Sequence, residues 1–355
     1  MEIVRAVQLS DLDALWQLIE QATYGLTTLQ ITKQQLAERI ELSNFAFNRR
    51  TEKPSGEPYV FVMEDIGQGT LDGQSHLVGL SCIFSKTGGY EPFYSYRRVA
   101  ESRYCELLQK TLEIETLHLE KIHDGPTEIG SLFLSPNFRG QGRGRLLSLS
   151  RFAFIGLYPR RFSEYVIAEM RGVTDNDGTC PFWEAIGRHF FQMDFPQADS
   201  LSTLNKRFIE DLMPRYPIYT SLLPESTRSI MGEVHSQTRP ALAMLESEGF
   251  RKIDLIDIFD GGPVVRCRRD QIDAVRRTHH RKVIAKDCEE GTTMILASTS
   301  GGFRSMLGKV QVEAEGGVRL EPQCASQLRI DVGDEIHLLE LYPAVDASSS
   351  LGERL

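Results

Sequence analysis

The feature that most constrains this chain is a glycine-rich turn between a predicted strand and a predicted helix. Residues 128–134 predict the strand, residues 139–144 read RGQGRG, and apolar residues at helical spacing follow from residue 146. Glycines let a ligand approach the backbone closely, and the amides at the start of a helix attract anions. The turn therefore predicts a site for a phosphate or pyrophosphate. A surface turn without function is the alternative.

Strands and helices alternate along most of the chain. Further strands are expected over residues 59–63, 77–84, 165–169 and 252–259, and a glycine-rich hairpin turn over residues 67–73. This order predicts an α/β (α+β) fold with a mixed central sheet. Residues 85–125 show no clear pattern, and their Tyr-rich start is a candidate loop over a site.

The character of the sequence changes near residue 266. Between Arg266 and Lys286 there are eight Lys or Arg residues against two acids, and only short strand-like runs follow. We therefore expect a main domain over residues 1–265, a basic linker over 266–285, a small C-terminal β-barrel over 286–345 and a flexible tail over 346–355.

Composition excludes several classes of protein. The net charge of -9 argues against a nucleic-acid partner, which needs concentrated positive charge. No apolar stretch reaches the roughly 18 residues of a membrane span, and the first residues show no basic-then-apolar leader. The six cysteines are scattered without Cys-x-x-Cys pairs, which argues against a metal site and favours a reducing compartment. We expect a cytoplasmic protein without a metal or membrane partner.

The turn is similar to the R/Q-x-x-G-x-G/A turn of the GNAT acyltransferase superfamily, which holds the pyrophosphate of coenzyme A. A second similarity lies downstream, where the run ALAMLESEGF over residues 241–250 resembles the late helix and E-x-x-G-F turn of GNAT domains. On its own this run is a packing helix with a glycine cap. Together the two segments imply a GNAT-like acyltransferase fold.

Longer segments resemble one family, the arginine N-succinyltransferases of arginine catabolism. They include LLSLSRF from residue 146, AEMRG from 168, FFQMDF from 190, GEVHSQT from 232 and IDIFDGGP from 256. The resemblance implies transfer of the succinyl group of succinyl-CoA to the α-amine of L-arginine or ornithine. It also implies that succinyl-CoA is a co-substrate, that no cofactor is bound permanently, and that the protein is a homo- or hetero-oligomer.

The predicted site residues fall into three groups. Those expected to bind coenzyme A lie on the strand and the turn: Leu132, Leu134, Arg139, Gly140, Gly142, Arg143 and Gly144. His235 is the catalytic candidate because histidine transfers protons near neutral pH and stands here before helix-start residues. The resemblance assigns the proton-donor histidine of the family to this position. A helix-entry histidine bonded to the backbone is the alternative.

The third group binds the acceptor and the acyl group. A guanidinium needs a carboxylate, for which Glu169, Asp257 and Asp260 are candidates, and Arg171 is the candidate for the succinyl carboxylate. Each of these acids has the alternative of a cap or a structural ion pair.

Two regions depart from the family, residues 23–25 and 85–125. They leave two other functions open: a regulatory subunit that senses acyl-CoA, and an N-acyltransferase for another amine or acyl group.

Overall fold

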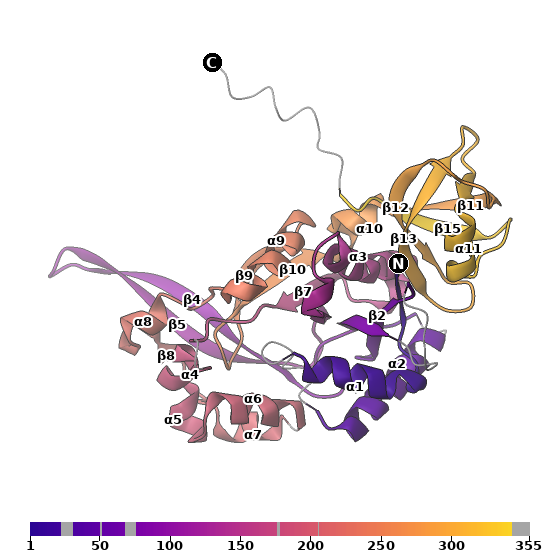
Figure 1. Cartoon of the computed structure of the whole chain (residues 1–355). Coiled ribbons are helices and arrows are strands. Elements are labelled where there is room, and N and C mark those ends of the chain that lie inside the picture. Colours follow the sequence, from indigo (N-terminus) through magenta and orange to yellow (C-terminus); the bar gives the residue numbers. More distant parts are fainter. Residues whose placement is uncertain (23–30, 50–51, 68–75, 176–177, 205, 343–355) are drawn as a thin grey trace, which may run out of the picture.

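A mixed sheet forms the centre of the molecule (Figure 1). The structure is a computed structural model that describes residues 1–22, 31–49, 52–67, 76–175, 178–204 and 206–342. The central strands are, in spatial order, β1 (Glu2–Ala6), β2 (Pro58–Asp65), β3 (Leu77–Phe84), β6 (Thr127–Leu134), β7 (Tyr165–Glu169), β10 (Pro263–Arg268) and β9 (Arg251–Ile256). Neighbours are antiparallel except for β6 and β7, which are parallel. The prediction of a mixed sheet is confirmed. The expected turn over residues 67–73 lies almost wholly outside the described residues.

Helices cover both faces of this sheet (Figure 1). α1 (Leu12–Glu20) and α2 (Lys33–Asn48) cover one face; α3 (Arg143–Leu157), α9 (Arg239–Ser247) and α10 (Asp273–Arg277) cover the other. Side chains alternate along β2: Val60 and Val62 face α1 and α2, whereas Phe61 and Met63 face α3. Because both faces are covered, successive residues of the strand are buried on opposite sides.

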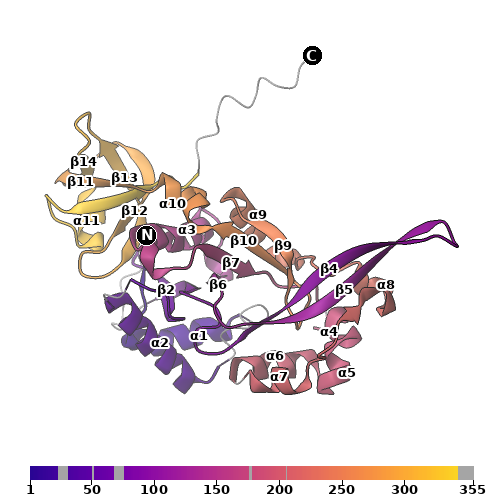
Figure 2. The same ribbon diagram turned by 180° about the vertical axis from the view of Figure 1, so that it is seen from behind.

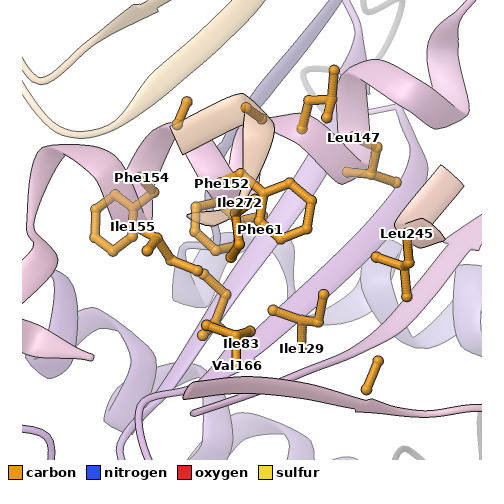
Figure 3. Packing of buried hydrophobic residues seen from close by; sticks show 14 of the residues in the cluster. Phe61, Ile83, Ile129, Leu147, Phe152, Phe154, Ile155, Val166, Leu245 and Ile272 are labelled. Carbon is orange, nitrogen blue, oxygen red and sulfur yellow. The ribbon is translucent and has the colours of Figure 1, made fainter. Parts of the chain in front are cut away.

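The packing between the sheet and α3 is largely aromatic. Phe154 of α3 lies with its ring centroid 5.5 Å from that of Phe61 and 5.1 Å from that of Phe303, which follows a barrel strand. Figure 3 shows Phe61, Phe152 and Phe154 among aliphatic side chains from the sheet, α9 and the segment before α10. This cluster fixes α3, and with it the turn at its start.

The C-terminal region is a closed five-stranded barrel. It consists of β11 (His279–Ala285), β12 (Thr292–Ser298), β13 (Arg304–Val312), β14 (Val318–Leu320) and β15 (Glu335–Leu339), with α11 (Pro322–Leu328). The pairings run β12–β15–β11–β14–β13, and β13 pairs back to β12. β13 also pairs with β1, which joins the barrel to the central sheet. The predicted barrel is confirmed.

The expected linker over residues 266–285 requires correction. Residues 266–268 end β10, α10 packs against α3, and β11 already belongs to the barrel. The basic residues misled the prediction because they are exposed or half-buried, whereas Ile272, Ala274 and Val283 between them are buried. The expected tail over residues 346–355 lies outside the described residues.

Residues 85–125 form a long two-stranded arm that projects from the body (Figures 1 and 2). β4 (Phe93–Cys105) and β5 (Lys110–Ile122) pair along their whole length. Among the described residues, other strands pair only with the base of the arm: β9 pairs at Tyr96 and Arg97, and β8 (Ile218–Tyr219) pairs at Thr116 and Leu117. The outer half is exposed on both sides, which removes the alternation that identifies a strand.

Short helices pack beside the base of this arm around the buried Trp183. They are α4 (Pro181–Ala185), α5 (Gly187–Phe191), α6 (Phe195–Leu204), α7 (Arg207–Leu212) and α8 (Glu225–Arg228). Single 3-10 turns complete the fold: η1 (Leu9–Asp11), η3 (Pro136–Phe138), η4 (Pro159–Arg161), η5 (Thr220–Leu222), η6 (Ser236–Thr238) and η7 (Arg269–Gln271). Within the described ranges, we find no helix that is both long and apolar enough to cross a bilayer.

Candidate active site

The glycine turn presents free backbone amides at the start of α3. Gly140, Gln141 and Gly142 have φ values of 98°, 51° and 76°, so three successive residues adopt the left-handed conformation. The amide of Arg143 donates to the carbonyl of Gly140 at 3.1 Å and that of Leu146 to the carbonyl of Gly142 at 2.8 Å, whereas the amides of Gly144 and Arg145 between them have no backbone acceptor among the described residues. No atom lies within 4 Å of a Cβ built on Gly140 or Gly144. An anion can therefore approach this backbone.

Arginines surround the turn, but they are engaged differently. Arg139 is exposed, contacts the carbonyl of Leu134 at 3.4 Å, and forms no ion pair with a described residue. Arg143 binds Glu2 at 2.6 Å. Arg145, which the sequence did not single out, binds Glu248 at 3.0 Å. The charge of Arg139 is therefore not neutralised by a described carboxylate and is available to a ligand.

β6 and β7 part just after they begin to pair. Their parallel register contains Thr127 opposite Val166 and Glu128 opposite Ile167, and no later pair. Ser131 lies in a β-bulge with φ of 50°, where the register between β3 and β6 shifts. The rest of β6, including Leu132 and Leu134, has β3 on one edge and no described strand on the other. An extended ligand can bind along that open edge.

Two cavities meet where the strands part. The larger has a volume of about 380 Å³ and extends past Tyr90, at the Tyr-rich start of residues 85–125. The smaller has a volume of about 100 Å³ and reaches Gly130 and Ser131 on β6. Five residues line both cavities: Glu128, Glu169, Asp199, Asp257 and Phe259. The passage between the two cavities is therefore strongly acidic.

Glu169 is the last residue of β7 and is paired with Val264 of β10. Its Oε1 atom is buried and has no hydrogen-bond partner among the described residues. Burial, and next the carboxylate of Asp257, raise the pKa of Glu169 well above its usual value. Unpartnered buried oxygens are rare in native proteins, so this one indicates a place for a ligand.

Asp257 and Asp260 build the turn that ends β9. Asp257 Oδ1 accepts the amides of Phe259 at 2.7 Å and Asp260 at 2.8 Å, which is why β9 stops at Ile256 and not at the expected residue 259. Burial, and next the charge of Asp260, raise the pKa of Asp257 to about 8. Asp260 Oδ1 accepts the amide of Gly262 at 2.8 Å. Both acids therefore have a structural role, whatever else they bind.

Arg171 lies at the smaller cavity between two carboxylates. Its guanidinium is 3.3 Å from Asp199 Oδ2 and 3.5 Å from Asp260 Oδ2, and it stacks over the ring of Phe195 at 4.9 Å. Burial nevertheless raises the pKa of Asp199 to about 6. These ion pairs fix Arg171 in place, and its Nη2 atom makes no hydrogen bond to a described residue.

The structure thus brings together Glu169, Arg171, Asp257 and Asp260, which are the four candidate substrate-binding residues. Glu128 and Asp199 line the same cavity and were not predicted from the sequence. Asp199 comes from α6, which packs across the cavity, and no local pattern marks it. Glu128 offered a signal, namely an acid beside buried residues of the strand that leads into the glycine turn.

His235 lines neither cavity but is joined to this site through the backbone of Arg171. Its amide donates to the carbonyl of Arg171 at 2.8 Å, and its Nδ1 accepts the amide of Gln237 at 3.3 Å. In the neutral ring this bond assigns the hydrogen to Nε2, which makes no hydrogen bond to a described residue. His235 therefore does bond to the backbone, as the alternative interpretation expected. One ring nitrogen nevertheless remains available for chemistry.

Comparison with known proteins identifies the family. The family model described as the arginine N-succinyltransferase beta subunit matches residues 2–274, and the model of its C-terminal domain matches residues 279–340. The chain belongs to the arginine N-succinyltransferase family. The resemblance stated from the sequence is confirmed, as is the prediction of an acyltransferase.

Curated members of the family match over nearly their whole length. The arginine N-succinyltransferase of Yersinia pseudotuberculosis is 36% identical over 349 residues, which cover 96% of this chain and 97% of that protein. The Escherichia coli protein of the same name is 37% identical over 345 residues, covering 96% and 98%. The arginine/ornithine succinyltransferase subunit AI of Pseudomonas aeruginosa has a TM-score of 0.85 at 28% identity, covering 96% of this chain and 99% of that one.

Proposed function

We propose that this family member transfers the succinyl group of succinyl-CoA to the α-amine of L-arginine, as a step of arginine catabolism. The observation that carries the proposal is the acidic passage that opens between β6 and β7 beside an anion-binding turn. The turn and the open strand edge can bind an acyl-CoA. The carboxylates can bind an amino acid that carries two cationic groups, an α-ammonium and a guanidinium. Ornithine is the second candidate acceptor, because the Pseudomonas aeruginosa relative is named for both amino acids.

Coenzyme A binds, on this proposal, as in a GNAT-like acyltransferase. The pyrophosphate lies on the amides of Gly140, Gly142 and Gly144, with Arg139 and Arg143 beside it. The amide-containing arm of the coenzyme runs along the open edge of β6 at Leu132 and Leu134. The thioester then reaches the smaller cavity. No permanently bound cofactor takes part.

Arginine binds in the larger cavity, whose volume of about 380 Å³ suits a small molecule. Its cationic groups offset the negative charge of Asp257 and Glu169, whose pKa values burial raises. Guanidinium pairs strongly with carboxylates because it donates in a planar fork. Glu169, Asp257 and Asp260 supply negative charge, and the Nη2 of Arg171 is available to the succinyl carboxylate.

His235 acts on the departing sulfur. When the tetrahedral intermediate collapses, the carbon–sulfur bond breaks and the thiolate gains negative charge. The Nε2–H of His235 donates a hydrogen bond to that sulfur and stabilises its charge, and the proton that completes the thiol is one of the two that leave the nitrogen of the acceptor. The alternative of a regulatory acyl-CoA sensor is not favoured, because full-length relatives are named as transferases.

We further propose an oligomer in the cytoplasm. The related Pseudomonas aeruginosa chain is named as a subunit, and here the tip of the β4–β5 arm exposes Leu107 and Leu108. Large exposed apolar side chains grouped on a projecting arm are typical of a subunit contact. The six cysteines are all free, which fits a reducing compartment.

The first prediction concerns the reaction. The protein should release the thiol of coenzyme A from succinyl-CoA when L-arginine is present, and the product should carry a succinyl group on the α-nitrogen. A thiol-detecting assay with product mass measures both. If folded protein releases no thiol with arginine or ornithine, the proposed function is wrong. Release only with another acyl-CoA or amine would assign the enzyme to a different acyl transfer.

The second prediction concerns the turn. Gly144→Glu should weaken coenzyme A binding at least ~10-fold, because the new carboxylate occupies the anion site and repels the pyrophosphate. Gly144→Ala is the matched control and should bind nearly as the wild type, since a Cβ at this position meets no atom within 4 Å. Gly142 is unsuitable, because a Cβ there would lie 2.8 Å from Leu341 Cδ2. Calorimetry that finds equal affinity for both variants would show that the turn binds nothing.

The third prediction concerns His235. His235→Ala should lower kcat by ~10²- to 10⁴-fold and leave coenzyme A affinity nearly unchanged, because the ring acts at the reacting centre. His189→Ala, on the exposed side of α5, is the control and should keep full activity. Steady-state kinetics and thermal melting of the same preparations test this. A His235→Ala protein with near-normal kcat and a lowered Tm would reduce His235 to its backbone-bonding role.

A further inference from the structure

The position of Glu169 identifies where the two substrates meet. The strands β6 and β7 are paired at Glu128 and separated by the level of Glu169. An acyl group that enters between the strands reaches the smaller cavity, and an amine reaches it from the larger one. Glu169 lines both. An amine that attacks the thioester must therefore pass close to this side chain.

The backbone of Glu169 has a structural role, whereas its carboxyl group is available for chemistry. Its backbone is held by pairing with Val264, and the next amide, of Met170, donates to the carbonyl of Pro263 at 3.0 Å. Its Oε1 atom, by contrast, is buried without a partner among the described residues. Asp260 differs in this respect, because both of its oxygens are engaged, by Gly262 and by Arg171.

The charges that face Glu169 favour the protonated acid. Asp257, Glu128 and Asp260 act in this direction, and Lys206 opposes them. A carboxylate with raised basicity accepts a proton from an ammonium group far more readily than an exposed one does. The incoming cation ionises Glu169 on binding and so prepares it to take a proton.

We propose that Glu169 accepts the proton that the α-ammonium group of the acceptor must lose before it attacks. The inference rests on the proposed function and adds the base to it. One N–H bond breaks and its proton passes to a Glu169 oxygen, and the freed lone pair forms the C–N bond with the thioester carbon. The C–S bond then breaks with its electrons on sulfur. Of the two protons that leave the nitrogen in total, one completes the thiol and the other passes through Glu169 to solvent.

Glu169→Gln tests the proposal, because the amide keeps the shape of the side chain and removes its basicity. We expect kcat to fall by ~10²- to 10⁴-fold. In the wild type, kcat should fall on the acid side of its pH profile as Glu169 becomes protonated. The variant should lose that limb, and its residual rate should keep rising with pH as free amine forms. Glu169→Asp keeps a carboxylate, and should retain the limb with an intermediate kcat.

Glu128→Gln is the matched control. It makes the same chemical change in a residue that lines the same two cavities, but on the strand that is still paired there. We expect this variant to raise KM for arginine through lost negative charge and to keep the acid limb of kcat. Thermal melting shows whether each variant is folded.

The outcomes separate the two proposals. An active wild type with a Glu169→Gln variant whose kcat lies within ~5-fold of it, or whose acid limb persists, would overturn the role of Glu169 and leave the proposed function intact. Equal loss in Glu128→Gln and Glu169→Gln would overturn it too, since charge alone would then explain both. A wild type that transfers no succinyl group would overturn the proposed function itself.

Discussion

The separation of β6 from β7 after a pairing of only two residues is the constraint on which the rest of the site depends. Two parallel strands that continued to pair would close the sheet and leave no edge for a ligand. Because they part, β6 keeps an open edge and Glu169 is left at the point of separation. Carboxylates from β6, β7, α6 and the turn after β9 then converge in one place. Burial and mutual repulsion raise the free energy of the ionised carboxylates, and the pKa values of Asp199, Asp257 and Glu169 are raised for this reason.

The barrel supports the other half of the site. Its Phe303 packs on Phe154 in the last turn of α3, and β13 pairs with β1 of the central sheet. The residues that follow β15 return to the start of α3, where the carbonyl of Leu341 accepts from Arg145 Nε at 2.5 Å. The glycine turn is therefore held between the sheet, α3 and the end of the barrel. Because these contacts fix α3, the turn before it keeps its left-handed conformation, and its amides remain accessible to an anion.

Local chemistry explains what the sequence alone could predict. The strand, glycine turn and helix around residues 128–157 follow from periodicity and from conformations that glycine favours, so their order was predictable. The bounds of β7 were predicted to the residue, because a short apolar run ends at an acid. The acidic passage was predicted only in part. Asp199 reaches it from a helix that packs beside the arm, and tertiary packing of this kind leaves no trace in local spacing. The arm was not predicted because the outer halves of β4 and β5 are exposed on both faces, so burial imposes no alternation of apolar and polar residues on them.

Proton release on arginine binding tests the central claim, that the buried carboxylates are held for a cationic substrate. Burial raises the pKa of Asp257 to about 8, so at pH 7 it holds a proton that an unperturbed carboxyl would have lost, and burial also raises the pKa of Glu169 well above its usual value. A bound cation lowers those pKa values, so the protons leave. The measurement is calorimetric titration of arginine into enzyme saturated with coenzyme A, which carries no acyl group to transfer, in two buffers of different ionisation enthalpy. The account predicts heats that differ between the buffers and correspond to release of roughly one proton per arginine bound. Equal heats in both buffers, with arginine bound, would contradict it.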